Sequence, residues 1–219
     1  MKKDGKDVIV PFSLYNDNAL QTLIRSPGDY SFSYNLKSFG DTTGHWAEKE
    51  ITFVTAREIF QGVEDGKFAP GGTMTRAMFV TALARLDGAD VTGYTGSRFG
   101  DVAGGQWYTG AVEWAAEHGI VSGVSSSQFA PDASVTREQM TLMLHNFMKV
   151  KGYVLKDKAE AGVFTDSGSI STWAAESVGI LQRAGIIDGK QGNAFDPRGL
   201  STRAEVSSIL ARFISGLVQ

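Results

Sequence analysis

Three arginines have the residue type and the position to bind an anion: Arg76, Arg137 and Arg203. Each follows a threonine, a good helix N-cap, so each arginine falls in the first turn of a helix. A cation there opposes the helix dipole and costs about 0.3–1 kcal/mol. A carboxylate or phosphate held between the guanidinium and the free N–H groups of the helix start would offset this cost. The alternative is pairing with an acidic side chain of the chain itself. The candidates for that pairing are Asp41, Asp101 and Asp166.

The threonines before these arginines are predicted to begin helices. Gln139 and Glu205 stand three residues after their threonines, which is the spacing of a capping box. The first copy has Met78 at this place, so its box is incomplete. The predicted N-caps are Thr75, Thr136 and Thr202.

A tryptophan and a glycine recur with each arginine. A recurring tryptophan is typical of a core, but an indole at the edge of a cleft is also a stacking surface for a sugar ring. The glycine is typical of a turn that needs a positive φ, although a bare backbone also lets a ligand approach closely. These candidates are Trp46, Trp107 and Trp173, with Gly62, Gly123 and Gly189.

The composition argues against several classes of function. The chain has 21 Lys+Arg, 24 Asp+Glu and a net charge of −3, so no overall positive field attracts nucleic acid or an anionic membrane. It has no cysteine, and His45, His118 and His145 take different places in the repeat, so no thiolate or zinc site is predicted. The motifs Gly-x-x-x-x-Gly-Lys-Ser/Thr, Gly-x-Ser-x-Gly and His-Glu-x-x-His are absent, and the acids form no obvious catalytic pair. We therefore predict no catalytic residue, no metal and no cofactor.

No run of 18 apolar residues occurs, and no apolar segment follows the basic start of the chain. This pattern predicts neither membrane insertion nor an export signal within these residues. A role outside the cell would make them a piece of a longer exported chain.

The recurring residues belong to three copies of one repeat. In each copy a glycine follows the tryptophan by 16 positions and an arginine follows it by 30. A Phe-x-Pro sequence lies between the glycine and the arginine. The copies cover residues 39–90, 99–150 and 164–219, and residues 1–38 differ in kind.

Each copy is predicted to form a helix after the tryptophan, a loop rich in Gly, Pro and Ser, and a second helix that begins at the threonine. The second helix carries an apolar stripe that a single helical hairpin cannot bury. We therefore expect a mainly α fold, in which three helix-loop-helix units form a bundle with approximate three-fold symmetry and with clefts where units meet. The stripes are Phe79, Val80, Leu83 and Leu86; Met140, Met143, Leu144 and Phe147; and Val206, Ile209, Leu210 and Phe213.

Residues 1–38 are predicted to be a short β segment, the end of a preceding domain docked on the bundle. Residues 7–15 and 30–36 alternate and are rich in β-formers, and the sequence Ser-Pro-Gly-Asp at 26–29 predicts a turn between them.

Taken together, Phe-x-Asp, Trp-Ala, Gly-Ile-x-x-Gly, Phe-x-Pro and Thr-Arg-Ala-Glu resemble the S-layer homology repeat, and the resemblance covers residues 39–219. The Thr-Arg-Ala-Glu motif falls on residues 75–78, 136–139 and 202–205, and only the third is complete. The resemblance implies a monomeric, pseudo-trimeric bundle that anchors a secreted protein to the cell wall, or S-layer, of a Gram-positive-type bacterium. The implied partner is the secondary cell-wall polymer attached to peptidoglycan. Its pyruvylated N-acetylmannosamine has a carboxylate that could be the anion expected at the arginines.

Two other functions compete with this one. A helical-repeat protein–protein interaction module would have the same bundle and no sugar ligand. A glycan hydrolase would need two positioned carboxylates, whereas the acids here recur at capping and loop positions.

Overall fold

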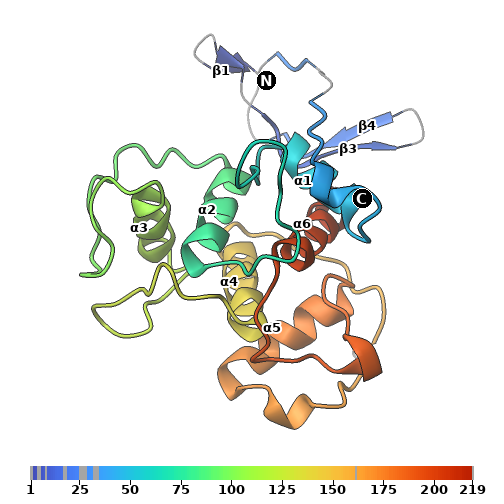
Figure 1. The fold of residues 1–219 in the computed structure, drawn as a ribbon. Coiled ribbons are helices and arrows are strands. Elements are labelled where there is room, and N and C mark those ends of the chain that lie inside the picture. Colours follow the sequence, from blue (N-terminus) through green and yellow to red (C-terminus); the bar gives the residue numbers. More distant parts are fainter. Residues whose placement is uncertain are drawn as a thin grey trace.

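The computed structural model describes residues 2–3, 6–7, 9–16, 19–24, 29–31, 35–160 and 162–218. Six α-helices and three short 3-10 turns follow two N-terminal strand pairs (Figure 1). The strands are β1 (Lys2–Lys3), β2 (Lys6–Asp7), β3 (Ser13–Asn16) and β4 (Ala19–Thr22). The helices are α1 (Glu48–Ala56), α2 (Arg76–Asp87), α3 (Thr109–Glu117), α4 (Arg137–Val150), α5 (Thr172–Arg183) and α6 (Arg203–Val218). The 3-10 turns are Gly40–Thr42, Ser167–Ser169 and Gln191–Asn193. The prediction of a mainly α fold with three repeats is confirmed.

The helices pair between repeats. α2, α4 and α6 lie around the centre of the bundle, and α1, α3 and α5 lie outside them (Figure 1). Each outer helix packs against the second helix of the preceding repeat: α3 on α2, α5 on α4, and α1 on α6. The last of these pairs joins the third repeat to the first, so the three repeats form a closed ring.

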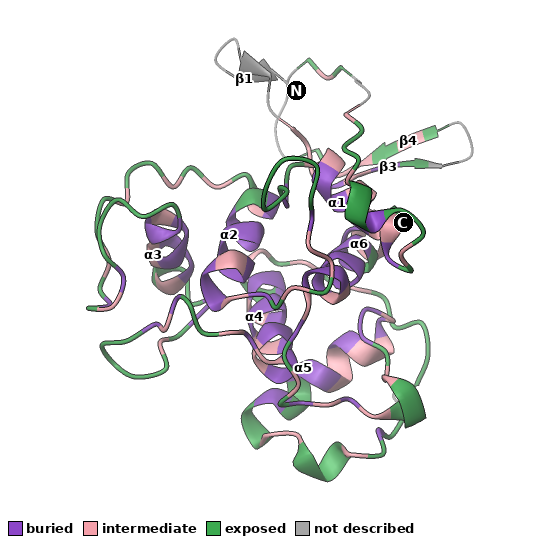
Figure 2. Cartoon of the chain, in the orientation of Figure 1, coloured by how far each residue is buried: buried purple, intermediate pink, exposed green. Residues whose placement is uncertain are grey.

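The core lies where the central helices meet (Figure 2). All twelve residues of the predicted apolar stripes are buried there, together with the phenylalanine of each Phe-x-Pro sequence, Phe68, Phe129 and Phe195. The stripes therefore face inward, as their helical spacing predicts.

A ring of backbone hydrogen bonds closes the centre of the bundle. The amide of Met74 donates to the carbonyl of Ser201 (2.8 Å), Ser201 to Val135 (3.0 Å) and Val135 to Met74 (2.8 Å). The start of each central helix is also satisfied by the next repeat, as when the amide of Arg76 donates to the carbonyl of Ala133 (2.9 Å). The N–H groups that a helix normally leaves free at its start are thus partly used for assembly.

The N-terminal segment docks on the bundle through Phe12, which is buried against Tyr153 and Phe213. The guanidinium of Arg57 donates to the carbonyls of Pro11 and Ser13. β3 pairs with β4 in an antiparallel hairpin.

The predicted strand at 7–15 was only partly right. β3 begins after Pro11, because proline has no N–H to donate to a strand partner. Its partner at 19–22 was not predicted. Residues 30–31 and 35–36 lie in no strand, and residues 26–28 of the predicted turn and residues 32–34 lie outside the described residues. Among the described helices, none combines the length and the apolar character needed to cross a membrane.

Candidate functional site

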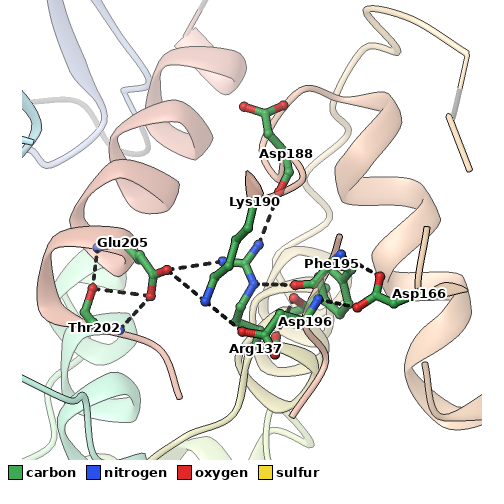
Figure 3. Close-up of polar contacts among 9 residues, drawn as sticks. Arg137, Asp166, Asp188, Lys190, Phe195, Asp196, Thr202 and Glu205 are labelled. Carbon is green, nitrogen blue, oxygen red and sulfur yellow. Dashed lines mark hydrogen bonds and ion pairs between the residues drawn. The ribbon is translucent and has the colours of Figure 1, made fainter. Parts of the chain in front are cut away.

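The three repeat arginines are buried and bind carbonyl oxygens of the next repeat. Arg137 is 4% exposed; its Nε donates to the carbonyl of Phe195 (2.7 Å) and its Nη2 to that of Asp188 (3.2 Å) (Figure 3). The other two arginines repeat this arrangement. The acceptors are Phe129 and Ser122 for Arg76, and Phe68 and Gln61 for Arg203, at 2.7–3.1 Å.

The repeat aspartates hold the same peptides from the other side. Asp166 accepts from the amides of Phe195 and Asp196, both at 2.7 Å (Figure 3). Asp41 and Asp101 do the same with the Phe-x pairs of their own repeats. The residue after each phenylalanine has a positive φ of 56–59°, and it is Ala69, Ala130 or Asp196. Each strained Phe-x-Pro turn is therefore fixed by an aspartate of its own repeat and an arginine of a neighbouring one.

These contacts change the interpretation of the arginine in the first turn of each central helix. The first helical turn does carry a buried arginine, but carbonyl oxygens of the neighbouring repeat stabilise its charge. The expected alternative, a direct pair with the repeat aspartates, does not form within 4 Å in any of the three copies among the described residues. Contact between an arginine and a ligand anion stays a prediction, and the nitrogen that these carbonyls leave open for it is Nη1.

The aspartates and arginines have perturbed ionisation. The hydrogen bond from the Phe68 amide lowers the pKa of Asp41. At Asp101 and Asp166 burial raises the pKa, but hydrogen bonds from the backbone outweigh it and leave each pKa below its ordinary value. Burial lowers the pKa of all three repeat arginines. Nearby carboxylates act in the opposite direction and raise the pKa: one carboxylate at Arg76, one at Arg203 and four at Arg137.

The repeat tryptophans lie at the surface. Trp46, Trp107 and Trp173 are 63%, 59% and 49% exposed. Of the two sequence interpretations, a core role is therefore wrong, because the core space is filled by the helix stripes and the Phe-x-Pro phenylalanines. Stacking on a sugar stays a prediction.

The repeat glycines are explained by close packing. Gly62, Gly123 and Gly189 are not among the residues with positive φ. A Cβ on Gly123 would lie 2.3 Å from the carbonyl oxygen of Ser125, and the other two glycines would also meet atoms at 2.6–2.7 Å. The expected positive-φ turn is therefore wrong at these positions. It occurs instead directly after the outer helices, as at Gly119 and Gly185.

The predicted caps form. The side chain of Thr75 accepts from the amide of Met78, and Thr136 forms a complete capping box with Gln139. Thr202 and Glu205 exchange the same two contacts, with Glu205 Oε2 2.8 Å from the Thr202 amide.

One groove brings several candidate residues together. It has a volume of about 150 Å³ and combines Trp46 of the first repeat, Arg137 of the second, and α6 with the preceding loop of the third. Glu205 and Gly189 also line it, so four sequence candidates meet here. The full lining is Trp46, Arg137, Ile187, Asp188, Gly189, Lys190, Glu205, Ser208, Ile209 and Arg212.

The groove contains charged residues that the motif search missed. Lys190 Nζ lies 2.9 Å from a carboxylate oxygen of Asp196 and 3.2 Å from one of Glu205 (Figure 3). Arg212 forms an ion pair with Asp188. A search for recurring residues passes over them because the position of Lys190 is a valine in the other copies. Comparing the copies for charges that replace apolar residues would have found it.

The groove can hold a ring against an exposed indole and an anion near a cation. Among the residues that the structure describes, no three His, Asp or Glu side chains gather as ligands for a metal ion would.

Comparison with known proteins places the repeats in a family. The sequence profile of the S-layer homology domain matches residues 38–78, 98–141 and 163–207. The chain is 34% identical to the amylopullulanase of Thermoanaerobacterium thermosulfurigenes, over 82% of this chain and 10% of that protein. It is 34% identical to exoglucanase XynX of Acetivibrio thermocellus, over 79% and 16%. It is 28% identical to the surface-layer 125 kDa protein of Lysinibacillus sphaericus, over 83% and 15%. The chain thus spans less than a fifth of the length of these relatives. Because the three matched segments cover more than half of it, this chain belongs to the S-layer homology domain family.

Proposed function

We propose that this chain is a non-catalytic carbohydrate-binding module that anchors a cell-surface protein to the wall of a Gram-positive-type bacterium. Its ligand is the secondary cell-wall polymer, and the recognised unit is a pyruvylated N-acetylmannosamine. The relatives support this role, because two polysaccharide-degrading enzymes and a surface-layer protein resemble the chain over only a small part of their length. What such different proteins share is better explained by attachment than by a common reaction.

The observation that carries the proposal is the groove between repeats, where an exposed tryptophan lies beside a nearly buried guanidinium. The indole of Trp46 offers a face to the sugar ring. Each repeat arginine has its Nε and Nη2 bound to carbonyls, so Nη1 is the atom left for a ligand carboxylate. A contact through Nη1 alone replaces the bidentate contact that a free arginine could make. Several such grooves acting on one polymer would add avidity.

The wall polymer can be tested directly as the partner. Purified sacculi with their polymer should retain the chain, and sacculi stripped of polymer by acid should release it. Retention on stripped sacculi would favour a protein or peptidoglycan partner and would contradict the proposal. Calorimetry should also show tighter binding to pyruvylated N-acetylmannosamine than to its pyruvate-free analogue, because only the former has the carboxylate.

The stacking surface needs a variant that keeps the fold. Trp46→Ala removes an exposed side chain, so the midpoint of urea unfolding should hardly move. Binding at its groove should weaken by about five- to tenfold, as expected for a lost aromatic platform worth about 1–1.5 kcal/mol. The matched control is Val154→Ala, because Val154 is an exposed apolar residue that does not line the groove. Calorimetry with the pyruvate-free sugar, which has no carboxylate for the acids of this groove to repel, measures the change, and unchanged affinity would exclude stacking there.

A further inference from the structure

The surroundings of the three repeat arginines differ in charge. Near Arg137 stand Asp188, Asp196 and Glu205, all from the third repeat. At the matching positions the first repeat has Gln61, Ala69 and Met78, and the second has Ser122, Ala130 and Gln139. All three acids are thus confined to one of the three sites.

Glu205 is the acid that lies near both cations that would bind an anion at this site, whereas Asp196 is paired with Lys190 alone. Its Oε1 is 3.2 Å from Lys190 Nζ and 4.0 Å from Arg137 Nη1 (Figure 3). Its Oε2 accepts from the amide of Thr202 at 2.8 Å, which fixes the carboxylate at the helix start. A ligand carboxylate would therefore meet a negative charge already placed between its two cations.

Arg76 and Arg203 are in the opposite situation. They are 4% and 6% exposed, and their Nε and Nη2 atoms bind carbonyls. Their Nη1 atoms have no hydrogen-bond or ion-pair partner among the described residues, and neither is fully enclosed, so both reach solvent. A nearly buried cation with no ion pair and only one carboxylate nearby gains more from an external anion than Arg137, which has four.

We propose that Glu205 sets the charge preference of the sites: it disfavours a carboxylated sugar at Arg137, so that the chain takes the acidic sugar first at Arg76 and Arg203. This inference rests on the proposed function and assigns binding of the acidic sugar to two of the three sites. The approximate symmetry of the ring places Trp173 and Trp107 beside Arg76 and Arg203, as Trp46 lies beside Arg137.

Two reciprocal variants test this division, because glutamate and glutamine both complete a capping box. In Glu205→Gln the competing charge is removed while the cap stays. Calorimetry with pyruvylated N-acetylmannosamine should then show an additional strong site, with affinity at the Arg137 groove raised by about tenfold. In Gln139→Glu the acid is placed at the Arg76 site, and one strong site per chain should be lost. Binding of the pyruvate-free analogue should change less than twofold in both.

The matched control is Asp157→Asn, which removes one negative charge from an exposed ion pair outside the groove. It should leave both affinity and stoichiometry as in the wild type. The effects of the two reciprocal variants should also shrink as salt is raised, because they are electrostatic.

The outcomes separate the two proposals. A wild-type chain that does not prefer the pyruvylated sugar contradicts the carboxylate mechanism, and the charge preference falls with it. A wild-type chain that does prefer it, with no change of stoichiometry or affinity in either reciprocal variant, overturns the role of Glu205 alone.

Discussion

Each buried arginine joins two repeats by holding a peptide of its neighbour. Arg203 Nε and Nη2 donate to the carbonyls of Phe68 and Gln61, both at 2.7 Å, and its guanidinium lies 4.3 Å from the centre of the Phe68 ring. The carbonyl dipoles thus stabilise a cation that opposes its own helix dipole. The sequence reveals the arginine at the start of the helix and the threonine N-cap before it. It cannot reveal the compensating partner, because every residue has a carbonyl and only the fold determines which ones converge.

Replacing Arg203 by methionine should destabilise the fold strongly. The apolar stem is kept, but the Phe68 and Gln61 carbonyls lose their donors, and an unsatisfied buried acceptor costs about 1–3 kcal/mol. We expect the free energy of unfolding in urea to fall by about 2–4 kcal/mol. Arg183→Met, at a half-exposed ion pair with Asp157, should change it by less than about 0.5 kcal/mol. Equal losses of unfolding free energy in the two variants would contradict a stabilising role for the contacts of Arg203 with the two carbonyls.

The loops between helices are shaped by glycines of two kinds. Gly119 ends α3 with a φ of +70° and has open space around it. Gly123 has no such φ, but its own loop closes over it. The spacing pattern of the repeat identifies Gly123, and a glycine at the end of a helical stretch, as at Gly119, is typical of a helix stop. The sequence cannot distinguish strain from crowding at Gly123, because crowding depends on which backbone atoms fold back.

Alanine substitutions should separate the two kinds of glycine in urea unfolding. Gly123→Ala places a Cβ against backbone oxygens that cannot move aside and should cost about 3 kcal/mol. Gly119→Ala only forces a positive φ and should cost about 1 kcal/mol. Gly96→Ala, at an exposed glycine with nothing within 4 Å of the added Cβ, is the control and should stay within about 0.5 kcal/mol. A larger loss at Gly119 than at Gly123 would refute this explanation.

The whole bundle is a ring in which every repeat completes the next. The apolar stripes correctly predict three packed units, because each stripe requires a partner. They do not say which partner, and the pairing of α1 with α6 follows only from the closed ring. The groove is likewise built from several repeats, so its full lining follows only from the fold. The sequence supplied Trp46, Arg137 and Glu205 for the groove. Lys190 and Arg212 were not found, because Lys190 replaces a valine of the other copies and Arg212 has a counterpart, Arg85, in only one of them.

Acid should weaken the ring through its aspartates. The pKa values of Asp41, Asp101 and Asp166 are lowered in the folded chain. Their stabilising contribution is therefore fully present above the unfolded value of about 3.9 and is lost as pH falls through the lower folded values. The urea midpoint should be steady from pH 7 to 5 and drop below about pH 4. Asp101→Asn should be less stable than the wild type at pH 7, and the difference should shrink at pH 2.5. A constant difference across this range would show that the charge is unimportant.

The docking of the N-terminal segment has a mechanical consequence. Phe12 packs on Phe213 of α6, and Arg57, directly after α1, holds the carbonyls of Pro11 and Ser13. Tension on the chain before residue 11 therefore enters the molecule where the first helix meets the last. No connecting loop joins α6 to α1, and this seam is held by side-chain packing and hydrogen bonds, whereas peptide chain also links α2 to α3 and α4 to α5. Under load, we therefore expect the α1–α6 seam to shear before the two seams whose helices are also linked by peptide chain.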